Sequence, residues 1–464
     1  MLTTHSPSHT HQDDNLDSHN ALDAGIHQLV AYFEAGTKTR AQSQMGFELE
    51  QIIVDSDNNT VPFAAPDCDE VSGSSCITAI LGRLSPLYDK EVRADKLKPT
   101  SPLIGLTRSN AAVSLEPGAQ FEFSSMPFWR LQDLHDVWEQ FQAELLSATR
   151  KFDLTPLTIG YQPRSKVADI VILPKERYNM MNQHFKITGK HGMNMMRGTA
   201  STQVTIDYSC ETDAIVKMRV AAALTPLFSL LTDNTPLFEG KPVEGHLKRT
   251  VIWNDVDPAR SMIPPGLFAP GYGFNEYAQT ALISPIILFD HADTVSYAGN
   301  KGAAECYDTD NLTRADIEHI LSMLFFDVRL RNYIEIRCAD SVPFPYALAY
   351  VALIKGLFYD EENLAALSAR FEHFTDECVP VIKAALIADA YNADVKAFYG
   401  ESVQSILREL LNRARQGLER LAARTDTGFE EAGYLDIFEP LIEGKTTLAE
   451  GTQWSQLRDC ERSS

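Results

Sequence analysis

Acidic side chains recur at every second position in several short apolar segments of this chain. In the segment Met45–Ile52, the alternation of a β-strand puts Glu48 and Glu50 on one face and Phe47 and Leu49 on the other. Three further segments repeat the pattern, and their polar faces carry Gln120, Glu122 and Ser124, then Gln203, Thr205 and Asp207, then Tyr333, Glu335 and Arg337. One such strand is common on a solvated antiparallel sheet, whereas four with this chemistry predict a sheet that holds divalent cations.

The electrostatic energy of these strands supports a cation site. Two carboxylates on alternate residues of a strand lie about 6.6 Å apart and repel by roughly 2.5 kcal/mol at an effective dielectric of about 20. The four segments contain no lysine and a single arginine, Arg337. Bound Mg²⁺ or Mn²⁺ would offset the repulsion, because these ions prefer oxygen ligands, and Mg²⁺ commonly bridges to nucleotide phosphates.

Arginines outside the acidic strands supply the opposite charge. Arg249 and Arg260 stand at the two ends of a segment whose composition predicts a strand followed by a turn, and Arg197 precedes the third acidic strand. The planar guanidinium group suits carboxylates and phosphates. A single arginine more often belongs to a structural ion pair than to a ligand site. Together, however, these arginines supply positive charge that complements the negative charge of the acidic face.

Length and charge limit the classes of protein that fit. The 464 residues, of which 44% are hydrophobic, can bury a large core. The formal net charge of -22 disfavours nucleic acids and anionic membranes as partners, since both attract basic surfaces. No apolar run predicts a membrane span, because Thr225 and Pro226 interrupt the most apolar segment, Arg219–Leu231.

Cysteine usage and the N-terminal segment predict a cytoplasmic protein. The seven cysteines lack metal-type CxxC pairing and suit a reducing compartment. Cys68 and Cys76 share a polar loop, where two free thiols are expected and a regulatory pair is the alternative. Residues 1–20 lack the apolar core of a secretory signal and are expected to form a disordered tail.

The elements that position the acidic strands suggest an α+β fold. Helix-period segments alternate with the strands over the ranges Ala21–Ala35, Leu131–Phe152, Thr212–Leu231, Ala315–Phe325, Leu348–Phe358 and Val395–Arg424. Parallel strands are buried on both faces, so one-sided polarity favours an antiparallel or mixed sheet, with a polar concave face for metal and helices on its other side. We expect residues 21–464 to form one catalytic domain, mostly helical from about residue 360.

The acidic strands and their neighbours resemble a known family. The segments that carry the resemblance are GFELEQ at 46–51, SLEPGAQFE at 114–122, MRGT at 196–199 with QVTID at 203–207, IWNDVDPAR at 252–260 and YIEIRCAD at 333–340. With these segments in the same order, the chain is similar to the glutamate–cysteine ligases (γ-glutamylcysteine synthetases) of plants and many bacteria, within the carboxylate–amine ligases related to glutamine synthetase. Three positions depart from the family's pattern: Ala119 replaces its second glycine, Thr205 an asparagine and Cys338 a glycine.

The resemblance implies an ATP-dependent ligase that joins the γ-carboxyl of L-glutamate to the amine of L-cysteine through a γ-glutamyl phosphate. It implies Mg²⁺, or Mn²⁺, held by Glu48, Glu50, Glu116, Glu122 and Glu335. In the same way it implies that Arg249 and Arg337 hold the glutamate carboxylate or the transferred phosphate and that Arg260 braces the phosphate. Nucleotide contacts are expected from Gln203, Thr205, Asp207 and Arg197.

Several alternatives stay open on the sequence alone. The acceptor can be another small amine, the chain can be a metal- or amino-acid-binding regulator without turnover, or it can transfer phosphate to a guanidino substrate. The protein can be a monomer or a homodimer. No Walker loop and no Gly-rich dinucleotide turn is present, so ATP would be held mainly by metal and sheet residues.

Overall fold

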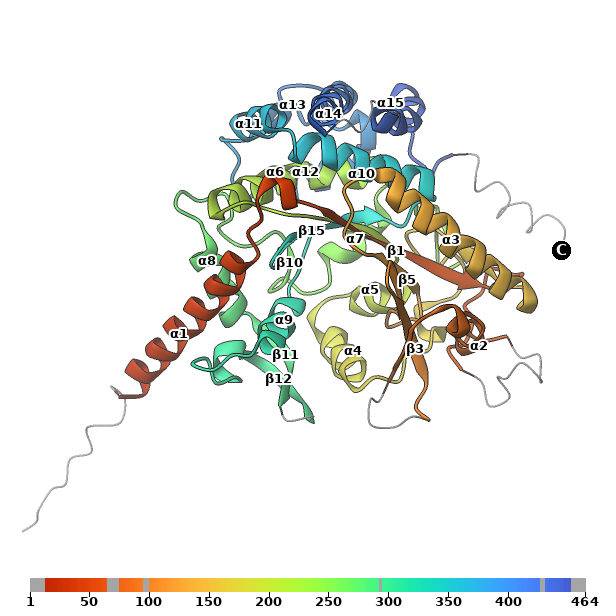
Figure 1. Ribbon diagram of the computed structural model, residues 1–464, viewed down its shortest axis with the longest axis horizontal. Coiled ribbons are helices and arrows are strands. Elements are labelled where there is room, and N and C mark those ends of the chain that lie inside the picture. Colours follow the sequence, from red (N-terminus) through yellow and green to blue (C-terminus); the bar gives the residue numbers. More distant parts are fainter. Residues whose placement is uncertain (1–12, 65–74, 95–99, 292–293, 426–429, 452–464) are drawn as a thin grey trace, which may run out of the picture.

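A nine-stranded antiparallel sheet forms the centre of the protein in a computed structural model that describes residues 13–64, 75–94, 100–291, 294–425 and 430–451 (Figure 1). The strand order is β14-β15-β7-β1-β5-β4-β3-β2, and β6 pairs with the end of β1. All pairs within this sheet are antiparallel. The antiparallel α+β prediction is therefore confirmed.

The four acidic segments lie on neighbouring strands of this sheet. Its strands are β1 (Met45–Val54), β2 (Lys90–Arg93), β3 (Leu103–Arg108), β4 (Ala111–Leu115), β5 (Phe121–Ser125), β6 (Thr155–Leu157), β7 (Ser201–Ile206), β14 (Val328–Leu330) and β15 (Ile334–Asp340). Strand β1 is central, because β5 pairs with one edge and β7 with the other. Outside the sheet, β8 (Leu237–Phe238) pairs with β9 (Lys241–Pro242), β10 (Ser261–Met262) with β13 (Phe325–Phe326), and β11 (Pro285–His291) with β12 (Thr294–Gly302).

Helices account for most of the remaining described chain. They are α1 (Asp13–Ala35), α2 (Ile77–Leu84), α3 (Leu131–Thr149), α4 (Glu176–Thr188), α5 (Gly192–Gly198), α6 (Glu211–Leu231), α7 (Lys248–Asn254), α8 (Phe274–Ile283), α9 (Arg314–Ser322), α10 (Phe344–Phe358), α11 (Glu361–Arg370), α12 (Cys378–Asp389), α13 (Lys396–Tyr399), α14 (Val403–Thr425) and α15 (Glu439–Gly444). Among the described residues no strand follows Asp340, in agreement with the helical C-terminal part predicted from about residue 360.

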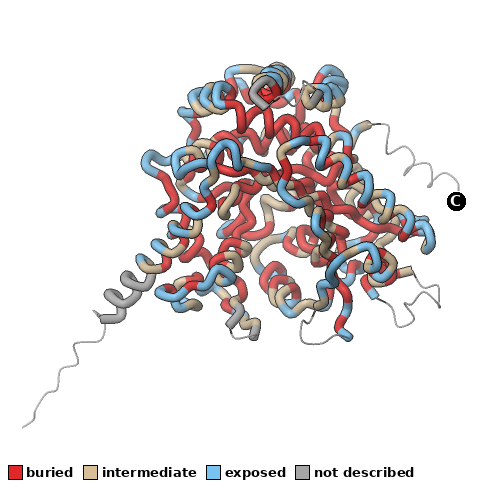
Figure 2. Tube along the Cα trace, viewed as in Figure 1, coloured by how far each residue is buried: buried red, intermediate tan, exposed pale blue. Residues whose placement is uncertain are grey.

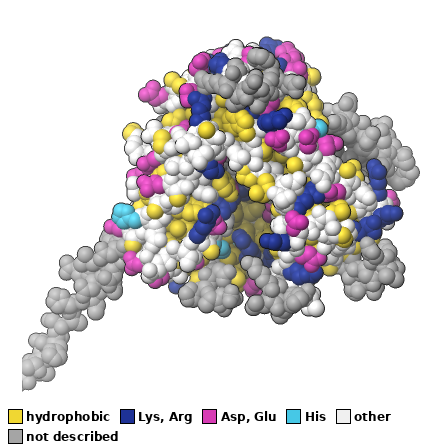
Figure 3. Space-filling view, in the orientation of Figure 1, with side chains coloured by type: hydrophobic (Ala, Val, Ile, Leu, Met, Phe, Trp, Pro, Cys, Tyr) yellow, Lys and Arg dark blue, Asp and Glu magenta, His cyan; other side chains and the backbone are white. Residues whose placement is uncertain are grey.

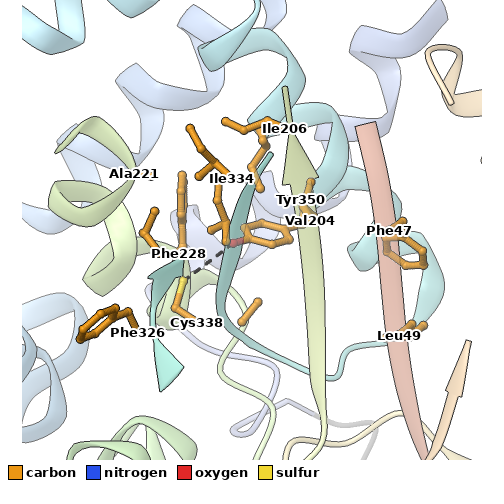
Figure 4. Packing of buried hydrophobic residues seen from close by; sticks show 14 of the residues in the cluster. Phe47, Leu49, Val204, Ile206, Ala221, Phe228, Phe326, Ile334, Cys338 and Tyr350 are labelled. Carbon is orange, nitrogen blue, oxygen red and sulfur yellow. Dashed lines mark hydrogen bonds between the residues drawn. The ribbon is translucent and has the colours of Figure 1, made fainter. Parts of the chain in front are cut away.

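The apolar face of the sheet packs on α3, α6 and α10. Phe47 and Leu49 of β1 and Val204 of β7 are fully or almost fully buried, and Figure 4 shows them in one layer with Phe228 of α6 and Tyr350 of α10. Cys338 joins this layer 3.8 Å from the Tyr350 hydroxyl, on the face opposite Arg337, as the alternation predicts. Figure 2 shows the buried chain concentrated in the sheet and in the helices directly against it.

The polar face is also covered. Helices α4, α5 and α7 lie across it on the side opposite α6 and α10 (Figure 1), and their side chains share one pocket with the sheet. The sequence predicted helices on the apolar face only. A polar face bearing ionisable groups binds ligands better in a partly closed pocket than in open solvent, because a lower local dielectric strengthens each charge interaction.

Three elements differ from the sequence expectation. Helix α1 begins at Asp13, inside the predicted disordered tail, while residues 1–12 lie outside the described chain. The segment after Leu247 forms helix α7 instead of a strand, so its β-branched residues are overridden by tertiary contacts. Helix α6 is long and apolar enough to cross a membrane by length and composition alone, but 89% of its apolar window is buried inside the protein.

The cysteines differ from the expected free thiols at one described position. Cys76, at the start of α2, is disulfide-bonded, which contradicts its prediction as a free thiol. Cys68, the other member of the considered pair, lies outside the described residues. Cys210, Cys306, Cys338 and Cys378 are free.

Candidate active site

One pocket on the polar face brings the predicted carboxylates together. Figure 3 shows a hollow near the middle of the molecule, edged by Lys and Arg side chains, in the region that Figure 1 places between α9, α4 and α5. Its acidic lining is Glu48 and Glu50 from β1, Glu116 from the β4–β5 turn, Glu122 from β5 and Glu335 from β15. The sequence alone therefore identified five acidic groups that converge from distant segments.

The carboxylates on β1 and β5 carry more negative charge than their surroundings neutralise. Burial, followed by repulsion from Glu335, raises the pKa of Glu48 to about 7. Burial and repulsion from Glu116 do the same for Glu50, whose pKa is also about 7. Burial and neighbouring carboxylates raise the pKa of Glu122 well above its ordinary value. These shifts indicate a site built for an added positive charge.

Hydrogen bonds orient these carboxylates without neutralising them. Glu50 accepts bonds from the Ser201 backbone N–H at 2.8 Å and from the Ser201 hydroxyl at 2.9 Å. The Ser114 hydroxyl donates to Glu122 at 2.7 Å. Glu116 begins a tight turn in which Ala119 adopts φ 64°, the left-handed region that favours the glycine of the family's pattern. Ala119 therefore adopts a backbone conformation in this turn that glycine adopts without strain.

Glu335 behaves differently because arginines surround it. Arg329 forms an ion pair with its carboxylate, Arg331 Nη1 lies 3.3 Å from Oε1, and Arg337 Nη1 lies 3.8 Å from Oε2. Burial alone would raise the pKa of Glu335, but the charges of these arginines outweigh it and lower the pKa to about 2. The Glu335 carboxylate is thus occupied by cations of the protein itself and orients them toward the pocket.

Arg249 lines the pocket and is held there by hydrogen bonds to an irregular part of the sheet. The pairing of β15 with β7 shifts between Ile336 and Ala339, and such a bulge frees backbone groups from the ladder. Arg249 donates to the carbonyls of Arg337 and Cys338, at 3.3 Å each. In helix α7 it stands one turn before Trp253, whose ring centre is 5.2 Å from its guanidinium carbon. The helix thereby places a cation and an aromatic ring together in the pocket.

Four predicted binding residues lie outside this pocket. Arg260 is fully buried and pairs with Asp257 at 2.6 Å, so it does not brace a phosphate directly. Arg197 donates to the carbonyls of Val167 and Ile170. The Asp207 carboxylate accepts from Lys38 and from the Gln44 N–H, and Thr205 stands over Gly46, beyond the pocket. Gln203 does line the pocket and accepts a hydrogen bond from Arg337.

The sequence missed several pocket residues. Helix α4 supplies Arg177, Tyr178 and Met181, α5 supplies Met195 and Met196, and α7 supplies Trp253. Phe325 comes from β13, Arg329 from β14 and Arg331 from the turn between β14 and β15. Within the described part of the chain, the Nε atoms of Arg177, Arg249, Arg331 and Arg337 are buried without a hydrogen-bond partner. The signal for Arg329 and Arg331 is their alternate spacing before Glu335, whereas nothing in α4 marks Arg177.

The pocket residues fit a magnesium-dependent site in the chemistry of their donors. The uncompensated groups are carboxylate oxygens, which Mg²⁺ and Mn²⁺ prefer. As the side chains stand, no three Asp, Glu, His or Cys groups among the described residues gather tightly enough to hold a metal alone. Mg²⁺ usually takes one or two carboxylates together with phosphates and water, so carboxylates spread along a pocket suit a metal that arrives with a nucleotide.

Curated proteins from plants are similar to this chain over most of its length. Glutamate–cysteine ligase B, chloroplastic, from Oryza sativa subsp. japonica is 30% identical over 433 residues, covering 91% of this chain and 82% of the relative. The chloroplastic glutamate–cysteine ligase of Arabidopsis thaliana is 29% identical over 440 residues, covering 91% and 78%. The chain therefore spans most of each relative.

A solved structure shares the fold. It is a glutamate–cysteine ligase from Francisella tularensis in complex with AMP, with a TM-score of 0.53, 10% sequence identity, and coverage of 86% of this chain and 82% of that chain. At this identity the likeness concerns the fold alone.

The plant relatives contradict the cytoplasmic location predicted from the sequence. Their names place them in the chloroplast. The prediction excluded a secretory leader because the first residues lack an apolar core, but transit peptides into plastids are amphipathic and lack such a core as well. The feature used therefore does not distinguish the two compartments.

The family comparison covers the whole pocket. The model described as "Glutamate-cysteine ligase family 2 (GCS2)" matches residues 44–442, a range that includes every pocket residue named above. We conclude that this chain belongs to glutamate–cysteine ligase family 2.

Proposed function

We propose that this protein ligates the γ-carboxyl of L-glutamate to the amine of L-cysteine with ATP, giving γ-glutamylcysteine, ADP and phosphate. The observation that carries the proposal is a single pocket in which under-neutralised carboxylates face arginines with free donors. Transfer of a phosphoryl group between two anions needs both kinds of group, because charge must be neutralised while the reactants are aligned. Membership of the family supports the two substrates.

The chemistry proceeds in two steps. The γ-carboxylate oxygen of glutamate attacks the γ-phosphorus of ATP, the bond to the β–γ bridging oxygen breaks, and ADP leaves. The cysteine amine then attacks the acyl phosphate, loses a proton and expels phosphate, so that an amide remains. No covalent bond to the protein forms, and the protein contributes binding, orientation and electrostatic stabilisation.

In this proposal the positively charged pocket residues bind the substrates, and the negatively charged ones bind the metal. Arg177, Arg249 and Arg337 hold anionic groups of the substrates through their free donors, while Glu335 keeps the neighbouring arginines in place. Glu48, Glu50, Glu116 and Glu122 would hold Mg²⁺, or Mn²⁺, with Gln203 as a neutral neighbour. When bound, the metal neutralises phosphate charge.

An amine panel tests the proposal directly. The purified full chain is incubated with ATP, MgCl₂ and L-glutamate, together with L-cysteine or another small amine, and both ADP and the amide product are measured. We expect ADP and γ-glutamylcysteine in equal amounts with cysteine. ADP release only with a different amine would overturn the acceptor, ADP without an amide would indicate another phosphotransferase, and ligand binding without ADP would indicate a regulator.

A further inference from the structure

Three buried ionisable residues form a network beside the pocket without lining it. His184 Nε2 donates to Asp257 Oδ2 at 2.8 Å, and Arg260 Nε donates to the same oxygen at 2.6 Å. The residues are 3%, 5% and 0% exposed, in that order. The other carboxylate oxygen of Asp257 accepts from the Ala259 N–H at 3.1 Å. None of the three residues lines the pocket, so the role of the network differs from that of the groups that face the pocket.

The network joins three walls of the pocket. His184 belongs to α4, and Asp257 and Arg260 belong to the turn that follows α7. Arg260 Nη1 donates to the Met323 carbonyl at 3.1 Å, and the Arg260 carbonyl accepts from the Phe325 N–H at 2.7 Å. Helix α4, helix α7 before the turn and strand β13 all supply pocket residues, for example Arg177 from α4, Trp253 from α7 and Phe325 from β13.

His184 lies just beyond the pocket, on the same face of α4 as two residues that line it. Positions 177, 181 and 184 follow the spacing i, i+4, i+7, so Arg177, Met181 and His184 share one face of the helix. A second contact holds the end of the helix to the same turn, where Thr188 Oγ1 donates to the Val256 carbonyl at 2.9 Å. Gly189 packs so closely on that turn that an added Cβ would lie 2.3 Å from the Asp255 carbonyl oxygen.

We propose that His184, Asp257 and Arg260 are positioning residues that lock α4 against α7 and β13, and thereby set where Arg177 meets the substrates. This inference rests on the proposed function, since the substrates give the position of Arg177 its meaning. Arg260 is thus assigned to the wall of the pocket instead of to a phosphate. The physical basis is that catalysis depends steeply on alignment, so a small displacement of a binding group is costly.

Replacing the donor on α4 tests the inference with the least damage to the core. His184→Phe keeps an aromatic ring at this position but removes the hydrogen bond to Asp257, and it leaves the Asp257–Arg260 pair intact. His184→Gln restores a donor near the Nε2 position. Gln183→Leu changes an exposed neighbour on the same helix and serves as the matched control. For each full-length variant, kcat and KM for ATP and glutamate are measured beside thermal unfolding.

We expect His184→Phe to lower kcat by about 10- to 100-fold in a folded enzyme, as misaligned groups do. His184→Gln should recover most of the loss, and Gln183→Leu should match the wild type. A purely structural role would lower the melting temperature and leave kcat of the folded enzyme unchanged, and that result would overturn the inference. If His184→Phe fails to fold, His184→Asn replaces it, because its shorter amide does not reach the Nε2 position.

The result also separates this inference from the proposed function. If the wild-type protein forms no γ-glutamylcysteine, the proposed function is wrong. If the wild type is active and folded His184→Phe turns over within twofold of it, only the positioning role is wrong.

Discussion

Glu50 of β1 and Glu122 of β5 are directly paired across the two antiparallel strands at the centre of the sheet. Side chains in such pairs have Cβ atoms about 4.5–5.5 Å apart, and like charges at these positions destabilise the sheet. Glu48 lies on the same strand face as Glu50 and pairs with Gln203 on the other side. The sheet therefore concentrates repulsion among Glu48, Glu50 and Glu122, whereas the arginines around Glu335 outweigh the effect of burial only on Glu335 itself.

The two kinds of carboxylate predict opposite effects of charge removal on stability. Glu48→Gln should raise the free energy of unfolding of the metal-free protein at pH 8 by about 1–3 kcal/mol, because it removes a buried charge whose pKa is raised to about 7. Glu335→Gln should lower it by about 3–5 kcal/mol, because buried Arg329 loses its partner. Urea unfolding with EDTA present measures both.

The same two variants should agree in their effect on turnover, although they differ in their effect on stability. Both variants should lose turnover by orders of magnitude, the first through metal binding and the second through misplaced arginines. Equal stability changes of the same sign in the two variants would contradict the charge assignment of the pocket.

The raised pKa values predict that the metal-free protein loses stability as the pH rises. The pKa of Glu48 and of Glu50 is about 7 in the folded state and near 4.5 in the unfolded chain, so the folded state binds more protons between these values. Stability should therefore fall from about pH 5 onward and level off only once the pH has passed the folded-state pKa values. Thermal unfolding from pH 5 to pH 8 in EDTA checks the sign. Glu48→Gln should flatten the curve, and an unchanged slope in that variant would be inconsistent with the assignment.

Short-range periodicity accounts for the part of the structure that the sequence predicted. Alternation alone places Glu48, Glu50 and Glu122 on one face, and the helical period predicted over Ala315–Phe325 corresponds to α9. Helix α7 was missed, because its Thr-Val-Ile-Trp run has the composition of a strand and only packing decides between the two.

The site was predictable only where its residues lie on strands of the sheet. Asp207 continues the alternation of β7, but the strand runs out of the pocket before it, and Lys38 occupies its carboxylate. Arg260 belongs to a family motif, yet the motif does not tell a wall residue from a ligand. Arg177 enters from a helix on the opposite wall, and no local pattern connects such a helix to the sheet.

Arg177 is expected to contribute to turnover although no local sequence pattern marks it as a pocket residue. Its Nε atom is buried in the pocket without a partner among the described residues, so an anionic substrate can accept its hydrogen bond. Arg177→Gln should lower kcat/KM by about 10- to 1000-fold, which corresponds to losing a charged hydrogen bond. Arg164→Gln removes an exposed arginine outside the pocket and is the matched control. Steady-state kinetics measure kcat/KM for both variants, and similar kcat/KM values would show that Arg177 does not contribute to the site.

Arg249 donates hydrogen bonds to two backbone carbonyls at the β15 bulge, and this arrangement predicts that lysine cannot replace it. The guanidinium group reaches the carbonyls of Arg337 and Cys338 together, whereas an ammonium group is a single point charge without the planar fork. Arg249→Lys should keep the positive charge of the pocket and still lower kcat/KM by about 100-fold or more, because Arg337 next to the bulge loses its fixed position. The neighbouring Lys248→Arg, made at a residue outside the pocket, should retain wild-type kinetics. If Arg249→Lys is as active as the wild type, charge alone suffices at this position and the bulge has no part in orienting the site.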